Sequence, residues 1–363
     1  MDTQKTTTPK TDEAIVTTDE PITDPADPYT ATYLEDNNTT NKVPVPQQLA
    51  LLAAILLLLL GTTVTTRVTD HFKDVAEATP ESTPYSQPRE ASTPQIAPEP
   101  TIKPFSEVSI TAKSAYVWDV QTQRVLYKKE PNKQVPLASV TKLMTALVAH
   151  ELLSENADIA ITDQAIRQYG NSGLLQDETF ERTTLSDLVL MSSSNDGAFA
   201  LAQAAGSILS PDEGATAFVH AMNIRAKELS LHDTYFKNPT GLDISEEEGG
   251  AYGSAKDMAF LMEYIATHQP QLLEATTQEQ SRVYSEDGIY HDAENTNYNI
   301  DEIPGLIGSK TGYTDLAGGN LVIAFNAGLN RPIVVSVLGS TRQERFTDVT
   351  ELVHEAQRHV AQQ

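Results

Sequence analysis

The segment Leu137-Ala-Ser-Val-Thr-Lys142-Leu-Met-Thr-Ala146 decides how this chain of 363 residues folds. Its apolar residues continue to Val148 at the i, i+3, i+4 and i+7 spacing of a buried helix face, which predicts a helix over residues 137–153. Ser139 then lies in the first turn, where free backbone N–H groups and the helix dipole favour negative charge on an attacking oxygen. Lys142 lies on the same face as the serine. The segment therefore pairs a candidate nucleophile with a candidate base.

A second motif, Ser193-Ser194-Asn195, separates two apolar stretches that are both predicted as helices. A tight connection between helices presents side chains to a cleft. We expect Ser193 to pass a proton to the leaving group and Asn195 to bind the substrate amide, while Asp196 caps the helix or makes internal hydrogen bonds. An ordinary turn that caps the following helix uses the same residue types, so the motif alone does not decide between these interpretations.

The third motif, Lys310-Thr311-Gly312, lies in a predicted strand. Side chains alternate along a strand, so Lys310 and Gly312 share one face and Thr311 takes the other. Glycine in a strand allows another backbone to approach closely. Lys310 and the Thr311 hydroxyl are candidates for binding a terminal carboxylate, and the charge of Lys310 would lower the pKa of Lys142 if the two lie opposite each other. The N–H groups of Tyr313 and Ser139 would then form an oxyanion hole.

The order of these motifs, with separations of about 50 and 115 residues, is that of penicillin-binding proteins and class A β-lactamases. Three segments carry a closer resemblance: residues 137–146, Asn238-Pro-Thr-Gly-Leu-Asp243, and Ser309-Lys-Thr-Gly-Tyr-Thr314 followed by Ala317-Gly318. They resemble the low-molecular-mass penicillin-binding proteins, the serine-type D-alanyl-D-alanine carboxypeptidase family. The likeness runs from about Ser106 to the end of the chain. Ser194 stands where many relatives have glycine, and the turn after Asp119 lacks the glycine often found there.

The resemblance implies that Ser139 attacks the carbonyl of the penultimate D-Ala of a peptidoglycan stem peptide. The terminal D-Ala leaves, and water releases the shortened peptide from the acyl-enzyme. β-Lactams are expected to acylate the same serine, and neither a metal nor a cofactor is required. A DD-endopeptidase of the same family and a membrane-tethered sensor that β-lactams acylate without turnover are the alternatives. A β-lactamase is disfavoured, because no Glu-x-x-Leu-Asn-like segment follows Asn195 at the expected distance.

The expected fold is α+β and β-lactamase/transpeptidase-like. Alternating apolar residues predict a hairpin around residues 115–127, and further strands at 308–314, 320–325 and 333–338. A final amphipathic helix follows the last of these strands. The residues between the two groups of strands are mainly helical in pattern. We therefore expect a five-stranded antiparallel sheet built from both chain ends, with a helical region inserted between them.

Composition divides the chain into four parts. Residues 1–47 are acidic, rich in Thr and Pro, and predicted to be a disordered tail. Residues 48–66 contain the uncharged run 49–64 and are predicted to be a transmembrane signal anchor; a cleaved signal peptide fits less well, because a long polar tail precedes the run. Residues 67–105 form a Pro/Ser/Thr-rich linker. Residues 106–363 form the catalytic domain, which we expect outside the cytoplasm of a single-pass cell-membrane protein.

The overall charge and the cysteine count exclude several other functions. Fifty acidic against 25 basic residues give a formal net charge of −25, which argues against a nucleic-acid partner because phosphate binding needs a basic surface. The chain has no cysteine, so disulfides, thiolate metal sites and cysteine nucleophiles are excluded.

Overall fold

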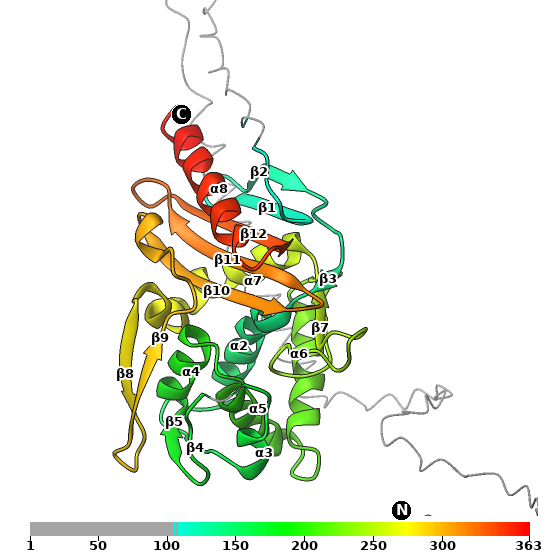
Figure 1. Ribbon diagram of the computed structural model, residues 1–363, viewed down its shortest axis with the longest axis vertical. Coiled ribbons are helices and arrows are strands. Elements are labelled where there is room, and N and C mark those ends of the chain that lie inside the picture. Colours follow the sequence, from blue (N-terminus) through cyan, green and yellow to red (C-terminus); the bar gives the residue numbers. More distant parts are fainter. Residues whose placement is uncertain (1–104, 106–107, 171) are drawn as a thin grey trace, which may run out of the picture. The chain divides into compact units, whose positions relative to one another are not determined.

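The computed structural model describes residue 105 and residues 108–170 and 172–363 (Figure 1). The predicted acidic tail and membrane anchor, and all of the predicted linker except Phe105, lie outside these residues. Among the helices of the described ranges, none is both long and apolar enough to cross a membrane.

A five-stranded antiparallel sheet forms from the two ends of the described chain (Figure 1). Its strands follow the order β10-β11-β12-β1-β2, so the first strand pairs directly with the last and Val117 lies opposite Val335. The strands are β1 (Ser114–Asp119), β2 (Arg124–Lys129), β10 (Leu306–Thr314), β11 (Gly318–Asn326) and β12 (Pro332–Ser340). The predicted α+β sheet is confirmed, and its three C-terminal strands extend slightly beyond the predicted bounds.

The sheet is buried on both faces, because alternate residues of its central strands enter two different cores. Leu321, Ile323 and Phe325 of β11 belong to the core beneath the final helix α8 (Glu344–Val360). Val322 and Ala324, which point the other way, belong to the larger core shared with the helical region. The predicted final amphipathic helix is thus confirmed and covers one face of the sheet (Figure 1).

The inserted region is mainly helical, as predicted. Its α-helices are α2 (Lys142–Leu152), α3 (Asp163–Ile166), α4 (Arg182–Met191), α5 (Asn195–Leu209), α6 (Ala215–Glu228) and α7 (Ala255–His268). The 3-10 helices are η1 (Ala138–Thr141), η2 (Pro270–Thr277) and η3 (Ile300–Glu302). Residues 142–149 of α2 are all buried, so this helix forms the centre of the region and carries one end of the site.

Three small antiparallel sheets in this region were not predicted. They pair β3 (Val135–Pro136) and β6 (Tyr235–Phe236) with β7 (Ala251–Gly253), β4 (Asp158–Ala160) with β5 (Thr179–Glu181), and β8 (Gln280–Tyr284) with β9 (Tyr290–Glu294). Most of these strands have two or three residues, too few to show a period of two. In β8 and β9 only one residue of each strand is buried, so the apolar alternation is weak there.

The turn between β1 and β2 contains no glycine. Asp119 Oδ1 accepts hydrogen bonds from the N–H groups of Gln121 and Thr122 at 3.0 and 3.1 Å. Gln123 adopts the left-handed conformation, with φ of 53°. The Asp119 side chain therefore supports the turn in which Gln123 takes the conformation that glycine adopts most easily.

Candidate active site

Ser139 lies in the 3-10 turn η1, and the α-helix begins only at Lys142. The prediction of a helix that starts at Leu137 is therefore wrong in this first turn. The cause is Ala138, whose φ of 48° is incompatible with a right-handed helix. The serine and the lysine nevertheless meet as predicted, because Lys142 Nζ donates a hydrogen bond to Ser139 Oγ over 2.9 Å.

Lys142 is fully buried and makes two further hydrogen bonds. Its Nζ donates to Asn195 Oδ1 at 2.7 Å and to the carbonyl of Thr240 at 2.9 Å. Burial lowers the pKa of Lys142 to about 7, against an opposing effect of the Asp196 carboxylate. A substantial fraction of this lysine is therefore neutral near pH 7, as a proton acceptor for the serine must be.

The segment Asn238–Asp243, which supported the family resemblance, holds the carbonyl that Lys142 contacts. Asn238 Oδ1 accepts the N–H of Gly241 at 2.7 Å, and its Nδ2 donates to the carbonyl of Leu242 at 2.8 Å. Gly241 has φ of 77°, and a Cβ there would lie 1.9 Å from the carbonyl oxygen of Ala138. This loop thus packs against the serine turn and fixes the carbonyl of Thr240, a role that the sequence did not reveal.

Ser193 and Asn195 stand at the junction of α4 and α5, as predicted. The capping is done by Ser194, whose Oγ accepts the N–H of Gly197 at 2.9 Å. The side chains on either side of it are directed to the site: Ser193 Oγ accepts a hydrogen bond from Lys310 Nζ at 2.9 Å, and Asn195 contacts Lys142. Ser193 has φ of 64°, so the turn is held in a conformation that serine seldom adopts.

Asp196 makes an internal hydrogen bond, in agreement with the prediction for it. Its Oδ2 accepts the N–H of Ser172 at 3.2 Å, and Asn195 Nδ2 donates to the carbonyl of Tyr169 at 2.7 Å. Burial is the main cause of a raised pKa for Asp196. The start of α5 therefore holds the chain around Tyr169 and Ser172 beside the site.

The lysine of the third motif is as buried as Lys142. Lys310 is 1% exposed, and its Nζ also donates to the carbonyl of Thr311 at 3.0 Å. Burial, and then the charges of Lys142 and Arg345, lower the pKa of Lys310 well below its usual value. We predicted that the charge of Lys310 would lower the pKa of Lys142. Burial is what lowers the pKa of Lys142, whereas the repulsion between the two lysines lowers the pKa of Lys310.

Gly312 allows β10 to approach the serine turn, as predicted. A Cβ at this position would lie 2.9 Å from the carbonyl oxygen of Leu137 and 3.1 Å from the nitrogen of Ser139. Thr311 Oγ1, which comes from the alternate position, donates to Thr296 Oγ1 at 2.6 Å. The oxyanion hole formed by the N–H groups of Ser139 and Tyr313 stays a prediction.

Two buried residues that position the site lie outside the three predicted motifs. Asn320 lies opposite Gly312 in the sheet, and its Nδ2 donates to the carbonyls of Pro136 and Leu137 at 3.1 and 3.0 Å. Arg345, from the start of α8, donates to the carbonyl of Gly312 at 2.7 Å. Both belong to no local motif, and only tertiary packing brings Asn320 to the serine turn and Arg345 to Gly312 of β10.

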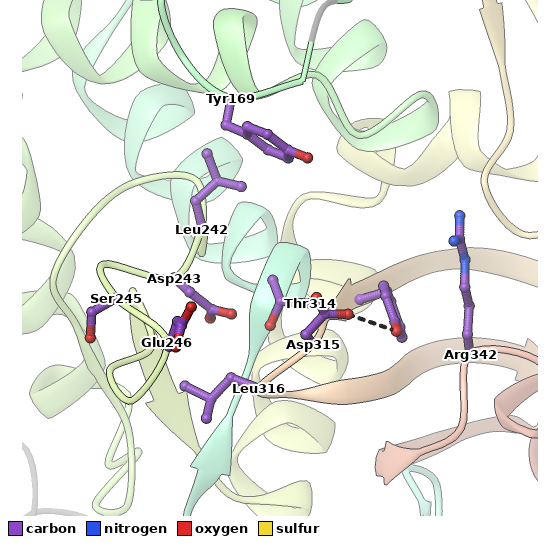
Figure 2. A pocket seen from close by; sticks show the side chains of 10 residues that line it. Tyr169, Leu242, Asp243, Ser245, Glu246, Thr314, Asp315, Leu316 and Arg342 are labelled. Atoms are coloured by element: carbon purple, nitrogen blue, oxygen red, sulfur yellow. Dashed lines mark hydrogen bonds between the residues drawn. The ribbon is translucent and has the colours of Figure 1, made fainter. Parts of the chain in front are cut away.

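Two cavities adjoin this cluster. The larger, of about 990 Å³, adjoins the end of β10 at Tyr313 and Thr314. Figure 2 shows Asp243 and Glu246 on one side of it and Arg342 on the other. The smaller, of about 380 Å³, is lined by residues that include Ser193, Asn195 and Thr296. Within the described part of the chain, no group of three His, Asp or Glu side chains is placed to hold a metal ion.

The five-stranded sheet with an inserted helical region, and the two lysines that contact two serines, define the class of penicillin-recognising active-serine proteins. The chain belongs to the D-alanyl-D-alanine carboxypeptidase family, peptidase S11, which matches it over residues 100–342. This result confirms the resemblance inferred from the motifs.

Known relatives agree with this membership. The chain is 34% identical to the D-alanyl-D-alanine carboxypeptidase DacF of Bacillus subtilis over 69% of its own length and 63% of that protein. It is 33% identical to a D-alanyl-D-alanine endopeptidase of Pseudomonas aeruginosa, over 67% of this chain and 76% of the relative. Among solved structures, penicillin-binding protein D2 from Listeria monocytogenes in its ampicillin-bound form superposes with a TM-score of 0.57 at 27% identity, over 69% of this chain and 98% of that one.

Proposed function

We propose that this protein is a serine-type D-alanyl-D-alanine carboxypeptidase that removes the terminal D-Ala from peptidoglycan stem peptides. One observation carries the proposal: Lys142 Nζ lies 2.9 Å from Ser139 Oγ in a buried environment that lowers the lysine pKa to about 7. A serine with such a base beside it is an activated nucleophile. Membership of the carboxypeptidase family supports the choice of substrate.

In the acylation step, Lys142 takes the proton of Ser139 while Oγ bonds to the carbonyl carbon of the penultimate D-Ala. The N–H groups of Ser139 and Tyr313 bind the oxygen that becomes negative, an effect worth a factor of about 10² to 10³ in rate for each donor. Ser193 passes its proton to the departing D-Ala nitrogen as the C–N bond breaks and takes a replacement proton from Lys310, which is hydrogen-bonded to it. Water then attacks the ester at Ser139 and gives up a proton to Lys310 through Ser193, while Lys142 returns its proton to Ser139 Oγ as the ester C–O bond breaks.

Two groups are proposed to hold the substrate. Lys310 and the Thr311 hydroxyl bind the terminal carboxylate, which supplies the negative charge that the buried Lys310 lacks. Asn195 binds the substrate amide. The Asn195 side chain already contacts Lys142 and the carbonyl of Tyr169. A side-chain amide oxygen has a second lone pair and its nitrogen a second hydrogen, so both remain available to a ligand.

We also propose that β-lactams acylate Ser139, since their ring carbonyl meets the same nucleophile and the Listeria relative is described in an ampicillin-bound form. The adduct would be detected as a mass increase of one penicillin per chain. We expect this increase in the parent and none in the Ser139→Ala variant. An adduct in both proteins would place the reactive group elsewhere.

A single-pass location in the cell membrane, with the catalytic domain outside the cytoplasm, is proposed from the apolar run at residues 49–64 and from the substrate, a cell-wall polymer. Carbonate extraction of cell membranes tests it. The full-length chain should stay in the membrane pellet, and a chain without residues 1–66 should be released. Release of both would remove the support for an anchor.

The decisive experiment measures D-alanine released from a pentapeptide ending in D-Ala-D-Ala, by the full-length protein and by its Ser139→Ala variant. Release by the parent alone supports both the reaction and the nucleophile. The name of the Pseudomonas relative favours an endopeptidase as the second candidate. A parent that releases no D-alanine but cleaves cross-linked stem peptides would establish that alternative, and acylation by penicillin without either activity would establish the sensor.

A further inference from the structure

Three of the exposed tyrosines of the described chain lie near one side of the site. Tyr284, Tyr290 and Tyr298 are 57%, 56% and 77% exposed, and they lie on the β8–β9 hairpin and in the segment that follows it. A single exposed apolar side chain needs no explanation, but a group of large aromatic rings on a surface is typical of a binding site. The hairpin therefore merits a functional assignment.

The outward face of the hairpin is ordered by its own contacts. Tyr284 lies opposite Tyr290, and Arg282 lies opposite Asp292, so the four side chains share one face. The guanidinium of Arg282 is 4.3 Å from the centre of the Tyr290 ring and 2.7 Å from an Asp292 carboxylate oxygen. We call these four residues the tyrosine face. The two aromatic rings and the mutually neutralised ion pair leave these four residues without net charge, and the outward Glu294 adds a negative charge at the end of the strand.

The tyrosine face is continuous with the smaller cavity of the site. Asp292 and Glu294, which point outward from β9, line that cavity together with Ser193 and Asn195, and so does Tyr298. From Tyr290 to Glu294 the strand advances about 14 Å. In Figure 1 the hairpin runs beside α4, away from the large sheet. A ligand longer than the cavity can therefore extend from it along the hairpin.

The direction of β10 shows which part of a substrate would reach this side. Ser193 and Thr296, which line the smaller cavity, contact Lys310 and Thr311, where the terminal carboxylate is proposed to bind. Tyr313 and the residues after it line the larger cavity instead. The stem that carries the scissile bond would therefore enter through the larger cavity. The tyrosine face lies beyond its carboxyl end.

We propose that the tyrosine face binds the glycan of a neighbouring strand of polymeric peptidoglycan. Sugar rings present flat C–H faces that pack on aromatic rings, and their hydroxyl groups pair with the arginine and the carboxylate of the ion pair. Because the four residues of the tyrosine face carry no net charge, the face suits an uncharged sugar better than it suits a charged membrane surface. This inference rests on the proposed function, and it adds a polymer-binding site to it.

The test compares a polymeric with a soluble substrate. Full-length protein, its Tyr284→Ala/Tyr290→Ala variant and an Ile224→Ala control, which changes an exposed residue of α6, are assayed for D-alanine release from purified sacculi and from a soluble pentapeptide. The double variant should lose about tenfold in activity on sacculi, because two aromatic contacts with the polymer are lost. Its activity on the pentapeptide should stay within about twofold of the parent, as for other surface changes.

A binding experiment separates this inference from the proposed function. In the Ser139→Ala background, co-sedimentation with sacculi needs no turnover, so it tests the face even if the parent releases no D-alanine. Tyr284→Phe/Tyr290→Phe should bind like the parent, because it keeps the rings. Equal sedimentation of the alanine variant and the parent overturns the proposal. A dimeric parent that becomes monomeric in the alanine variant also overturns it, because the face would then be an interface between two copies of the chain.

Discussion

Single residues control the protonation of the site, and Lys142 is the clearest case. Its pKa of about 7 lies below the usual value because the ammonium group is buried. As pH falls below about 7 the lysine becomes charged and cannot accept the serine proton. We therefore predict that kcat/KM for pentapeptide hydrolysis falls about tenfold per pH unit on the acid side, with its midpoint near pH 7. A rate that stays constant from pH 5 to 8 would contradict a lysine base.

The side-chain amide of Asn320 is expected to position the serine turn. Asn320→Leu removes the hydrogen bonds to the carbonyls of Pro136 and Leu137, and it leaves the buried N–H of Gly339 without the oxygen that accepts it. The free energy of unfolding should fall by about 2–4 kcal/mol, since each buried unpaired group costs about 1–3 kcal/mol. The rate of acylation by penicillin, measured well below the melting temperature, should fall as well. An unchanged acylation rate would show that Asn320 is only structural.

The elements show a sharp division between what the sequence predicts and what only the fold reveals. The strands of the main sheet are long and buried on both faces, so β10, β11 and β12 were found at nearly their true bounds. The serine turn was mistaken for α-helix, because the left-handed conformation of Ala138 is imposed by tertiary contacts and leaves no pattern. The candidate site residues came from motifs, whereas Asn320 and Arg345 act across the sheet and belong to none.

The contact between β10 and the serine turn is an element-scale interaction that one methyl group can disturb. Gly312→Ala places a Cβ 2.9 Å from the carbonyl oxygen of Leu137, and neither backbone can yield without moving Ser139. We predict a loss of activity of about 10² or more, since small displacements of reacting groups are that costly. Gly328→Ala is the matched control, because its Cβ would meet nothing closer than 3.8 Å. Full activity of Gly312→Ala would show that the turn tolerates displacement.

At the scale of the whole molecule, Asp348 joins the two ends of the described chain. Its carboxylate accepts the N–H groups of Thr111 and Ala112 at 2.8 and 2.9 Å and the hydroxyl of Ser340 at 2.6 Å. Asp348→Ala should lower the free energy of unfolding by about 3 kcal/mol, because two backbone N–H groups lose a charged partner. Denaturant unfolding measures this change. The kcat/KM of the folded variant should remain that of the parent, and a selective loss of activity would assign Asp348 a role in the site.

The position of β10 at the end of the strand order has a consequence for the form in which substrates bind. Within the described chain, no further strand pairs with β10 beyond its contact with β11. An edge strand is a template for another extended chain, which it binds through main-chain hydrogen bonds. A stem peptide beside Lys310 and Gly312 would thus be recognised largely by its backbone, as a sixth strand. Extended peptides that cannot be cleaved should therefore compete with penicillin for this edge, whatever their side chains.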